Sequence, residues 1–164
     1  MAEHYNILFL CTGNSARSIM AEAILNAQAD SRFTAFSAGS HPSGKVRSEA
    51  LQVLVANNIP ATGLRSKSWN EFAQPDAPKI DFVFTVCDNA AREACPLWPG
   101  QPVTAHWGAP DPAAVTGSAQ EIDRAFREAF LLLRRRIELF LRLPLASLDR
   151  LALEQKLRQI GSAS

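Results

Sequence analysis

The sequence has no long hydrophobic run near its N-terminus. The longest one there is ILFL, residues 7–10, and Glu3 precedes it without a basic segment. A signal peptide needs a basic flank and a longer apolar core, and a membrane-spanning helix needs about 20 apolar residues. We therefore expect a cytoplasmic protein without a membrane partner.

An excess of charge of either sign is also missing. Seventeen Lys and Arg residues balance sixteen Asp and Glu residues, which leaves a formal net charge of +1. A nucleic-acid partner needs a broad basic field, so we expect none, and any anion site must be local. The three histidines, His4, His41 and His106, do not have the spacing of metal ligands.

Cysteine is scarce and odd in number, because Cys11, Cys87 and Cys95 are the complete set. Secreted disulfide scaffolds use a dense and even set of cysteines, so this count indicates reduced thiols that are available for chemistry. The 164 residues, 47% of them hydrophobic, suffice for one compact domain with a substantial core.

The sequence does contain an alternation of strand and helix patterns. The continuous apolar run at residues 7–10 is typical of a strand buried in a parallel sheet, residues 81–86, DFVFTV, are the clearest strand, and residues 33–36 and 103–106 predict two more. Helical spacing predicts helices over residues 18–28, 43–57, 88–94, 122–141 and 148–160. The pattern predicts an α/β fold, in which Cys11 and Cys87 follow strands that end at one edge of the sheet.

A cationic run, Arg134 to Arg136, lies late in the longest predicted helix. Basic residues near a helix C-terminus are favoured by the helix dipole, and a short run of them usually lies in solvent. We expect a solvated face here rather than a nucleic-acid site.

The stretch CTGNSARS, residues 11–18, connects a predicted strand to a predicted helix. Its small polar residues leave backbone N–H groups free to point at an oxyanion, and the helix dipole favours both that anion and the thiolate of Cys11. Arg17 can hold two anion oxygens at once, and a hydroxyl of the loop can hydrogen-bond the sulfur. The expected anion-binding residues besides Arg17 are Thr12, Gly13, Asn14, Ser15, Ala16 and Ser18.

The loop matches C-x5-R-S, the phosphate loop of cysteine-dependent phosphatases. With this motif near the N-terminus, the chain resembles the low-molecular-weight tyrosine phosphatase fold and, within it, the arsenate reductases, over nearly all of its first 140 residues. The resemblance implies a three-layer α/β sandwich with a central, mostly parallel four-stranded sheet and an extra C-terminal helix. We expect a phosphatase-like domain at residues 1–143 and a helical extension, residues 144–164, packed on it.

That fold places an Asp-Pro pair in a late loop over the site, where the Asp protonates the departing oxygen. Asp111 and Pro112 fit this role in the segment HWGAPDP, although an Asp before Pro is also a common turn pair. The phosphatases continue with aromatic residues that hold phosphotyrosine. Here the next residues, 113–115, are Ala, Ala and Val, so the sequence favours a small, bare oxyanion.

Arsenate reductases of this fold place two further cysteines around a short helix, in a pattern similar to CDNAAREACP, residues 87–96. Eight residues of helix rise about 12 Å, whereas disulfide-bonded α-carbons lie roughly 4.4 to 6.8 Å apart. A bond between Cys87 and Cys95 would therefore require the helix to unwind. The alternative is that both are buried core thiols.

The resemblance implies a relay that starts at Cys11, passes through Cys87 and ends at Cys95. It needs no tightly bound cofactor but an external reductant, for which thioredoxin, a glutaredoxin or a low-molecular-weight thiol all qualify. Two other functions stay open: an aryl or tyrosyl phosphatase that uses Cys11, Arg17 and Asp111, and a non-catalytic oxyanion-binding or thiol-sensing protein.

Some members of the family bind potassium beside the loop. Asn14, Glu22 and Ser37 match the positions of its ligands, but Trp69 or Asn70 replaces the acidic residue expected near the segment SKS. The resemblance thus implies at most a potassium site there and no other metal.

Overall fold

The four strands form one parallel sheet in the order β2-β1-β3-β4. The computed structural model describes residues 4–87, 98 and 101–162. The strands are β1, Tyr5–Leu10; β2, Phe33–Ala38; β3, Phe82–Thr85; and β4, Val103–His106. The expected α/β fold with a four-stranded sheet is confirmed. β1 lies in the interior of the sheet, so its carboxyl end opens onto the edge where the loop after it can bind a ligand.

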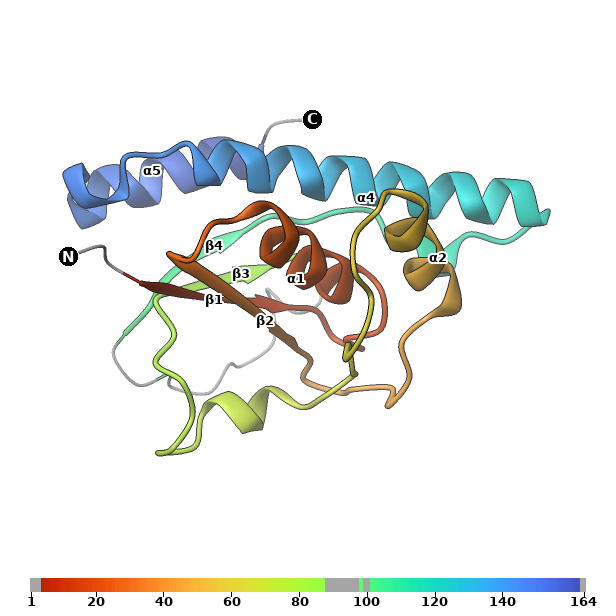
Figure 1. The fold of residues 1–164 in the computed structure, drawn as a ribbon, viewed down its shortest axis with the longest axis horizontal. Helices are drawn as coiled ribbons and strands as arrows, with labels where there is room; N and C mark the ends of the chain where they lie inside the picture. Colours follow the sequence, from red (N-terminus) through yellow and green to blue (C-terminus); the bar gives the residue numbers. More distant parts are fainter. Residues whose placement is uncertain (1–3, 88–97, 99–100, 163–164) are drawn as a thin grey trace.

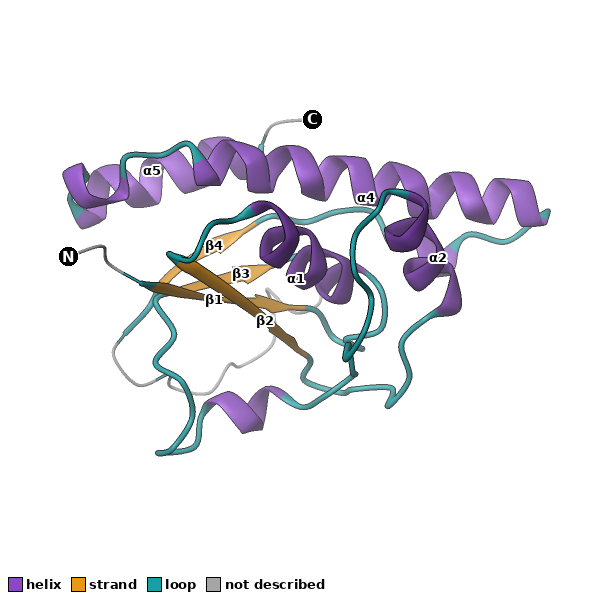
Figure 2. Ribbon diagram, viewed as in Figure 1, coloured by secondary structure: helices purple, strands orange, loops and turns teal. Residues whose placement is uncertain are grey.

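Helices cover one face of this sheet (Figures 1 and 2). They are α1, Arg17–Gln28; α2, Ser48–Ala56; α4, Ala119–Leu141; and α5, Arg150–Gly161. Figure 1 shows α4 and α5 along one side of the molecule, where α4 packs on α1 and α5 packs on β4. Three 3-10 turns complete the described elements: η1, Trp69–Phe72; η2, Pro112–Ala114; and η3, Leu145–Ser147.

Side chains of β1 alternate between two hydrophobic clusters because successive residues of a strand point to opposite faces. Phe9 packs in the larger cluster under the helices, where the rings of Phe84 and Trp107 stack with centroids 3.9 Å apart. Leu8 packs in the smaller cluster on the other face, with Phe72 of η1. Burial on both faces explains why β1 is apolar throughout its last four residues.

Two predictions from the sequence need correction. The helix expected over residues 43–57 begins only at Ser48, because backbone N–H groups of Ser43 and Arg47 donate to the loop after β1 instead of a helical ladder. Arg136 does not lie in solvent but is 5% exposed, since it shares the inner face of α4 with Leu133 and Phe140. The helix predicted over residues 88–94 lies outside the described residues.

Among the helices within residues 4–87 and 101–162, none combines the length and the apolar character needed to cross a bilayer.

Candidate oxyanion and thiol site

The loop between β1 and α1 presents Cys11 at the carboxyl edge of the sheet. The Cys11 N–H still pairs with the carbonyl of Ala38 on β2 (3.2 Å), and α1 begins at Arg17. The Cys11 side chain is 5% exposed. The thiol therefore lies at the floor of a loop whose far end is the N-terminus of a helix.

The outer side of this loop is held by backbone donors from the segment 41–47, which we call the belt. The N–H of His41 donates to the carbonyl of Thr12 (2.9 Å), and the N–H of Ser43 donates to that of Gly13 (3.0 Å). The N–H of Arg47 donates to the carbonyl of Ser15 (2.9 Å). In a trans peptide the following N–H points away from the carbonyl. The N–H groups of Gly13, Asn14 and Ala16 therefore turn to the inner side of the loop, where an oxyanion can accept them.

Asn14 fixes the shape of the loop from within. It has a positive φ of 46° and is fully buried. Its amide donates to Oγ of Ser18 (2.8 Å), and its Oδ1 accepts the N–H of Lys67 (2.8 Å). Asparagine tolerates this left-handed backbone better than most residues, and its side chain is fully engaged in holding it.

Cys87, which follows β3, lies next to this loop. The backbone N–H of Thr12 donates to Sγ of Cys87 (3.3 Å), and Cys87 is 3% exposed. A hydrogen bond with Cys87 raises the pKa of Cys11, burial raises it further, and the charge of Arg17 opposes both. The two thiols predicted to begin the relay are thus neighbours. Cys95 lies outside the described residues.

Arg17 and Asp111, separated widely in sequence, meet above the loop. Nη1 of Arg17 donates to the carbonyl of Ala109 (2.8 Å), and Nη2 lies 3.6 Å from Oδ2 of Asp111. The other carboxylate oxygen of Asp111 accepts the N–H of Ala113 (3.0 Å). Asp111 is 44% exposed, so solvent and a departing oxygen can both reach it.

Sequence reasoning missed a second arginine that holds the loop of Asp111. Nη1 of Arg136 donates to the carbonyls of Trp107 (2.8 Å) and Gly108 (2.7 Å). Desolvation lowers the pKa of Arg136. The signal was present in the helical spacing, because residue 136 falls three positions after Leu133 and four before Phe140.

A hollow of about 210 Å³ adjoins Asp111. It is lined by Pro110, Asp111, Pro112, Val115, Ala125, Glu128, Ala129 and Leu132. No aromatic ring takes part in this lining, in keeping with the sequence after Pro112.

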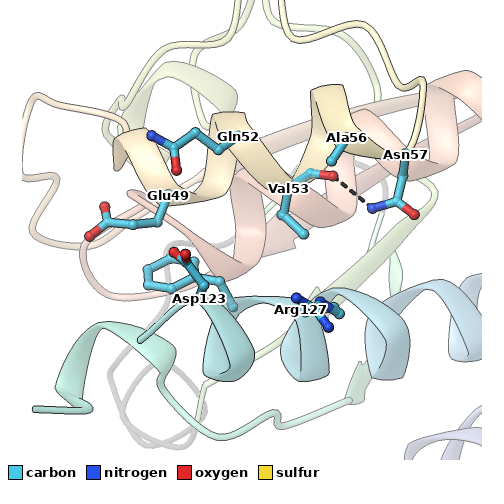
Figure 3. A pocket seen from close by; sticks show the side chains of 8 residues that line it. Glu49, Gln52, Val53, Ala56, Asn57, Asp123 and Arg127 are labelled. Carbon is cyan, nitrogen blue, oxygen red and sulfur yellow. Dashed lines mark hydrogen bonds between the residues drawn. The ribbon is translucent and has the colours of Figure 1, made fainter. Parts of the chain in front are cut away.

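A separate hollow of about 200 Å³ lies between α2 and α4 (Figure 3). Its lining includes Glu49, Asn57, Asp123 and Arg127, and Figure 3 shows the Asn57 amide bonded to the carbonyl of Val53. Glu49 is paired with Arg47 (3.0 Å). Because this lining holds no thiol and no residue of the loop, we place the candidate site at the loop.

Two of the three residues that match the potassium ligands, Glu22 and Ser37, are hydrogen-bonded to each other. Oγ of Ser37 donates to Oε1 of Glu22 (2.6 Å), and the same carboxylate oxygen lies 3.7 Å from Nζ of Lys67. Within the part of the chain that the structure describes, no three His, Cys, Asp or Glu side chains group as metal ligands.

Comparison with known proteins gives consistent results. The model of the low molecular weight phosphotyrosine protein phosphatase family matches residues 6–155. Over 134 residues the chain is 33% identical to the arsenate reductase of Halalkalibacterium halodurans, covering 82% of this chain and 93% of that protein.

Among solved structures, the arsenate reductase of Archaeoglobus fulgidus DSM 4304 is 26% identical, with a TM-score of 0.59 over 80% of this chain and 98% of that one. The thioredoxin-dependent arsenate reductase of Corynebacterium glutamicum is 23% identical, with a TM-score of 0.56 over 85% of this chain and 64% of that one. The second likeness is one of fold alone.

Proposed function

The chain belongs to the low molecular weight phosphotyrosine protein phosphatase family, and from that premise we propose that it is an arsenate reductase, an enzyme that reduces arsenate to arsenite with thiols. The observation that carries this proposal is the contact between the loop of Cys11 and the thiol of Cys87. A phosphatase of this family needs one cysteine at the loop, whereas a reductase must draw two electrons from a pair. Two curated relatives, each 33% identical to the chain, are named arsenate reductases.

The first step is substitution at arsenic. The thiolate of Cys11 forms a bond to arsenic while the inward N–H groups and Arg17 hold the remaining oxygens. The bond from arsenic to one hydroxyl group of the arsenate breaks, and this hydroxyl leaves as water after it takes a proton from Asp111. Because Oδ2 of Asp111 lies 3.6 Å from Nη2 of Arg17, the proton donor Asp111 and the anion-binding Arg17 can act on the same arsenate.

The second step is the reduction. The thiolate of Cys87 attacks Sγ of Cys11, and the sulfur–arsenic bond breaks with its electron pair left on arsenic. Arsenic(V) becomes arsenic(III) and departs as arsenite, while Cys11 and Cys87 together lose two electrons and form a disulfide.

In the third step Cys95 attacks Cys87, which releases Cys11 and leaves a disulfide between residues 87 and 95. An external dithiol then reduces this disulfide. We infer a thioredoxin-type reductant, because a relative of the same fold is thioredoxin-dependent. Reduced thiols are kept in the cytoplasm, so we place the enzyme there.

Steady-state turnover of arsenate with thioredoxin and thioredoxin reductase tests this function. We expect the Cys87→Ser variant to produce no arsenite, because the adduct on Cys11 then has no thiol to reduce it. Asp111→Asn should slow turnover by about 10²- to 10⁴-fold, as expected for loss of a general acid. Mass spectrometry after one wild-type turnover should map a disulfide to Cys87.

Hydrolysis of an aryl phosphate by the same variants separates the two chemistries. A phosphatase would lose hydrolysis with Cys11→Ser and keep it with Cys87→Ser. Arsenate turnover that survives Cys87→Ser would contradict the relay.

A further inference from the structure

Polar side chains are buried beneath the oxyanion loop, in a cluster that the thiol relay does not use. Asn14 and Ser37 are fully buried, and Lys67 is 8% exposed. The carboxylate of Glu22 lies among them with 17% exposure. Lysine is rarely buried to this degree, because its ammonium loses the solvation of water unless it finds a partner.

The ammonium of Lys67 has two partners in this cluster. Nζ donates to the carbonyl of Arg65 (2.8 Å) and lies 3.7 Å from Oε1 of Glu22. Burial lowers the pKa of Lys67, and the charge of Glu22 opposes that effect. Glu22 in turn accepts the hydroxyl of Ser37 (2.6 Å). The ammonium of Lys67 supplies the counter-charge that this carboxylate, largely withdrawn from solvent, requires.

The backbone of Lys67 connects this charge pair to the loop. Its N–H donates to Oδ1 of Asn14 (2.8 Å), and its carbonyl accepts the N–H of Gly39 (2.9 Å). Gly39 lies so close to the loop that a Cβ there would stand 2.4 Å from the carbonyl oxygen of Thr12 and 2.6 Å from that of Cys11. The backbone of residue 67 is therefore bonded both to Asn14 of the loop and to Gly39, which lies against the backbone of the nucleophile.

This arrangement does not fit a resident potassium ion. A potassium ion is held by several oxygen atoms that face it. Here Oδ1 of Asn14 already accepts the N–H of Lys67, and Oε1 of Glu22 already accepts the hydroxyl of Ser37. An ammonium 3.7 Å from that carboxylate would also repel a second cation.

We propose that Lys67 is a positioning residue whose ammonium serves as the internal counter-ion of the oxyanion loop, in place of a bound monovalent cation. It touches neither arsenate nor a thiol, and it acts by holding Glu22 and Asn14. Any effect on turnover rests on the proposed arsenate reduction, whereas ion selectivity and stability do not.

Thermal unfolding at equal ionic strength in potassium, sodium and choline chloride tests the proposal without arsenate. We expect the wild-type Tm to be the same in all three salts. The Lys67→Gln variant removes the charge but offers an oxygen, so its Tm in choline chloride should fall by roughly 10 °C. Potassium should restore part of this loss in a saturable manner.

Lys156→Gln provides the matched control, since Lys156 is an exposed lysine on α5. It should unfold like the wild type in every salt. The rate of Cys11 alkylation serves as a second readout and should change with Lys67→Gln but not with Lys156→Gln.

Three results would overturn the proposal. A saturable stabilisation of the wild type by potassium, over sodium and choline, would mean that the site accepts the ion despite Lys67, and this comparison requires no folded variant. A Lys67→Gln protein as stable as Lys156→Gln would mean that the ammonium is not needed. A Lys67→Gln protein that is destabilised but not rescued by potassium would contradict the proposal that the ammonium of Lys67 serves in place of a bound cation. Failure of the arsenate assay alone would leave all three measurements intact.

Discussion

The protonation of Cys11 is set by a neighbour that the mechanism also uses. In the anion-free protein, the hydrogen bond with Cys87 and the burial of the thiol both raise the pKa of Cys11, and only Arg17 opposes them among the side chains around it. The nucleophile of the proposed reaction and the second thiol of the proposed relay are therefore coupled through a hydrogen bond.

Removal of Cys87 should lower the pKa of Cys11. In Cys87→Ala the largest cause of the raised pKa is gone while Arg17 is unchanged, so more thiolate is present at a given pH. We expect the pH profile of Cys11 alkylation by iodoacetamide, followed on its own peptide by mass spectrometry, to move to lower pH.

Cys87→Ser is the control for this measurement. Its hydroxyl can still hydrogen-bond Cys11, so its profile should lie between those of the wild type and Cys87→Ala. If the pH profile of Cys11 alkylation in Cys87→Ala is unchanged or moves to higher pH, Cys87 does not raise the pKa of Cys11.

At the scale of elements, α4 does more than cover the sheet. Its N-terminus is fixed by a capping box between Ser118 and Glu121, and its inner face carries Arg136 to the carbonyls of Trp107 and Gly108. The same loop is held from the other side by Arg17 through Ala109. Two arginines from two helices thus fix the backbone that leads to Asp111.

Arg136→Met should destabilise the protein by about 2 kcal/mol, because two charge-assisted hydrogen bonds to buried carbonyls are lost while the packing volume is largely kept. Chemical denaturation measures this change. Arg135→Met, at the exposed neighbour in the same run, should remain within about 0.5 kcal/mol of the wild type. Equal effects of the two substitutions would place Arg136 back in solvent.

Local sequence patterns predicted the presence of strands and helices better than the residues at which they begin and end. Residues predicted as strands overlap every strand of the sheet, and the signal is strongest in β1 and β3, whose burial on both faces leaves an apolar run. The start of α2 was missed, since the N–H groups of Ser43 and Arg47 are engaged by carbonyls about thirty residues earlier in the chain. No window around residue 43 contains that information.

At the scale of the whole molecule, α5 completes the core rather than standing apart from it. Leu153, Leu157 and Ile160 belong to the same buried cluster as Phe9 and Trp107. The indole N–H of Trp107 donates to the carbonyl of Leu157 (3.0 Å). The division into residues 1–143 and an extension of residues 144–164 stays a prediction, but the contacts of α5 reach the strand that precedes the Asp111 loop.

Leu157→Ala should cost about 2–5 kcal/mol of unfolding free energy, because Leu157 is fully buried and its removal leaves a cavity beside Trp107. Leu151→Ala, at a position 66% exposed on the same helix, should change stability by less than about 0.5 kcal/mol. Urea denaturation followed by tryptophan fluorescence gives both values. A small effect of Leu157→Ala would mean that α5 is dispensable for the fold.

The site as a whole was predictable only in part. The motif that contains Cys11 and Arg17 is a short sequence pattern, as is the pair Asp111-Pro112, and both can be recognised from the sequence alone. Lys67 was not foreseen, because its role depends on Glu22 and Asn14 meeting it in space, and a lysine in a polar segment normally signals a surface.

The belt around the oxyanion loop has a consequence for how this protein can evolve. Its three contacts use only backbone N–H groups, and Pro42, which has none, stands between His41 and Ser43 where no donor is required. A substitution of His41, Ser43 or Arg47 by any residue other than proline therefore keeps the N–H donor that each contact needs, whereas a proline there removes it. The conformation of the oxyanion loop is thus compatible with many sequences in the belt, although the side chains at these positions make contacts of their own, such as the ion pair of Arg47 with Glu49 (3.0 Å).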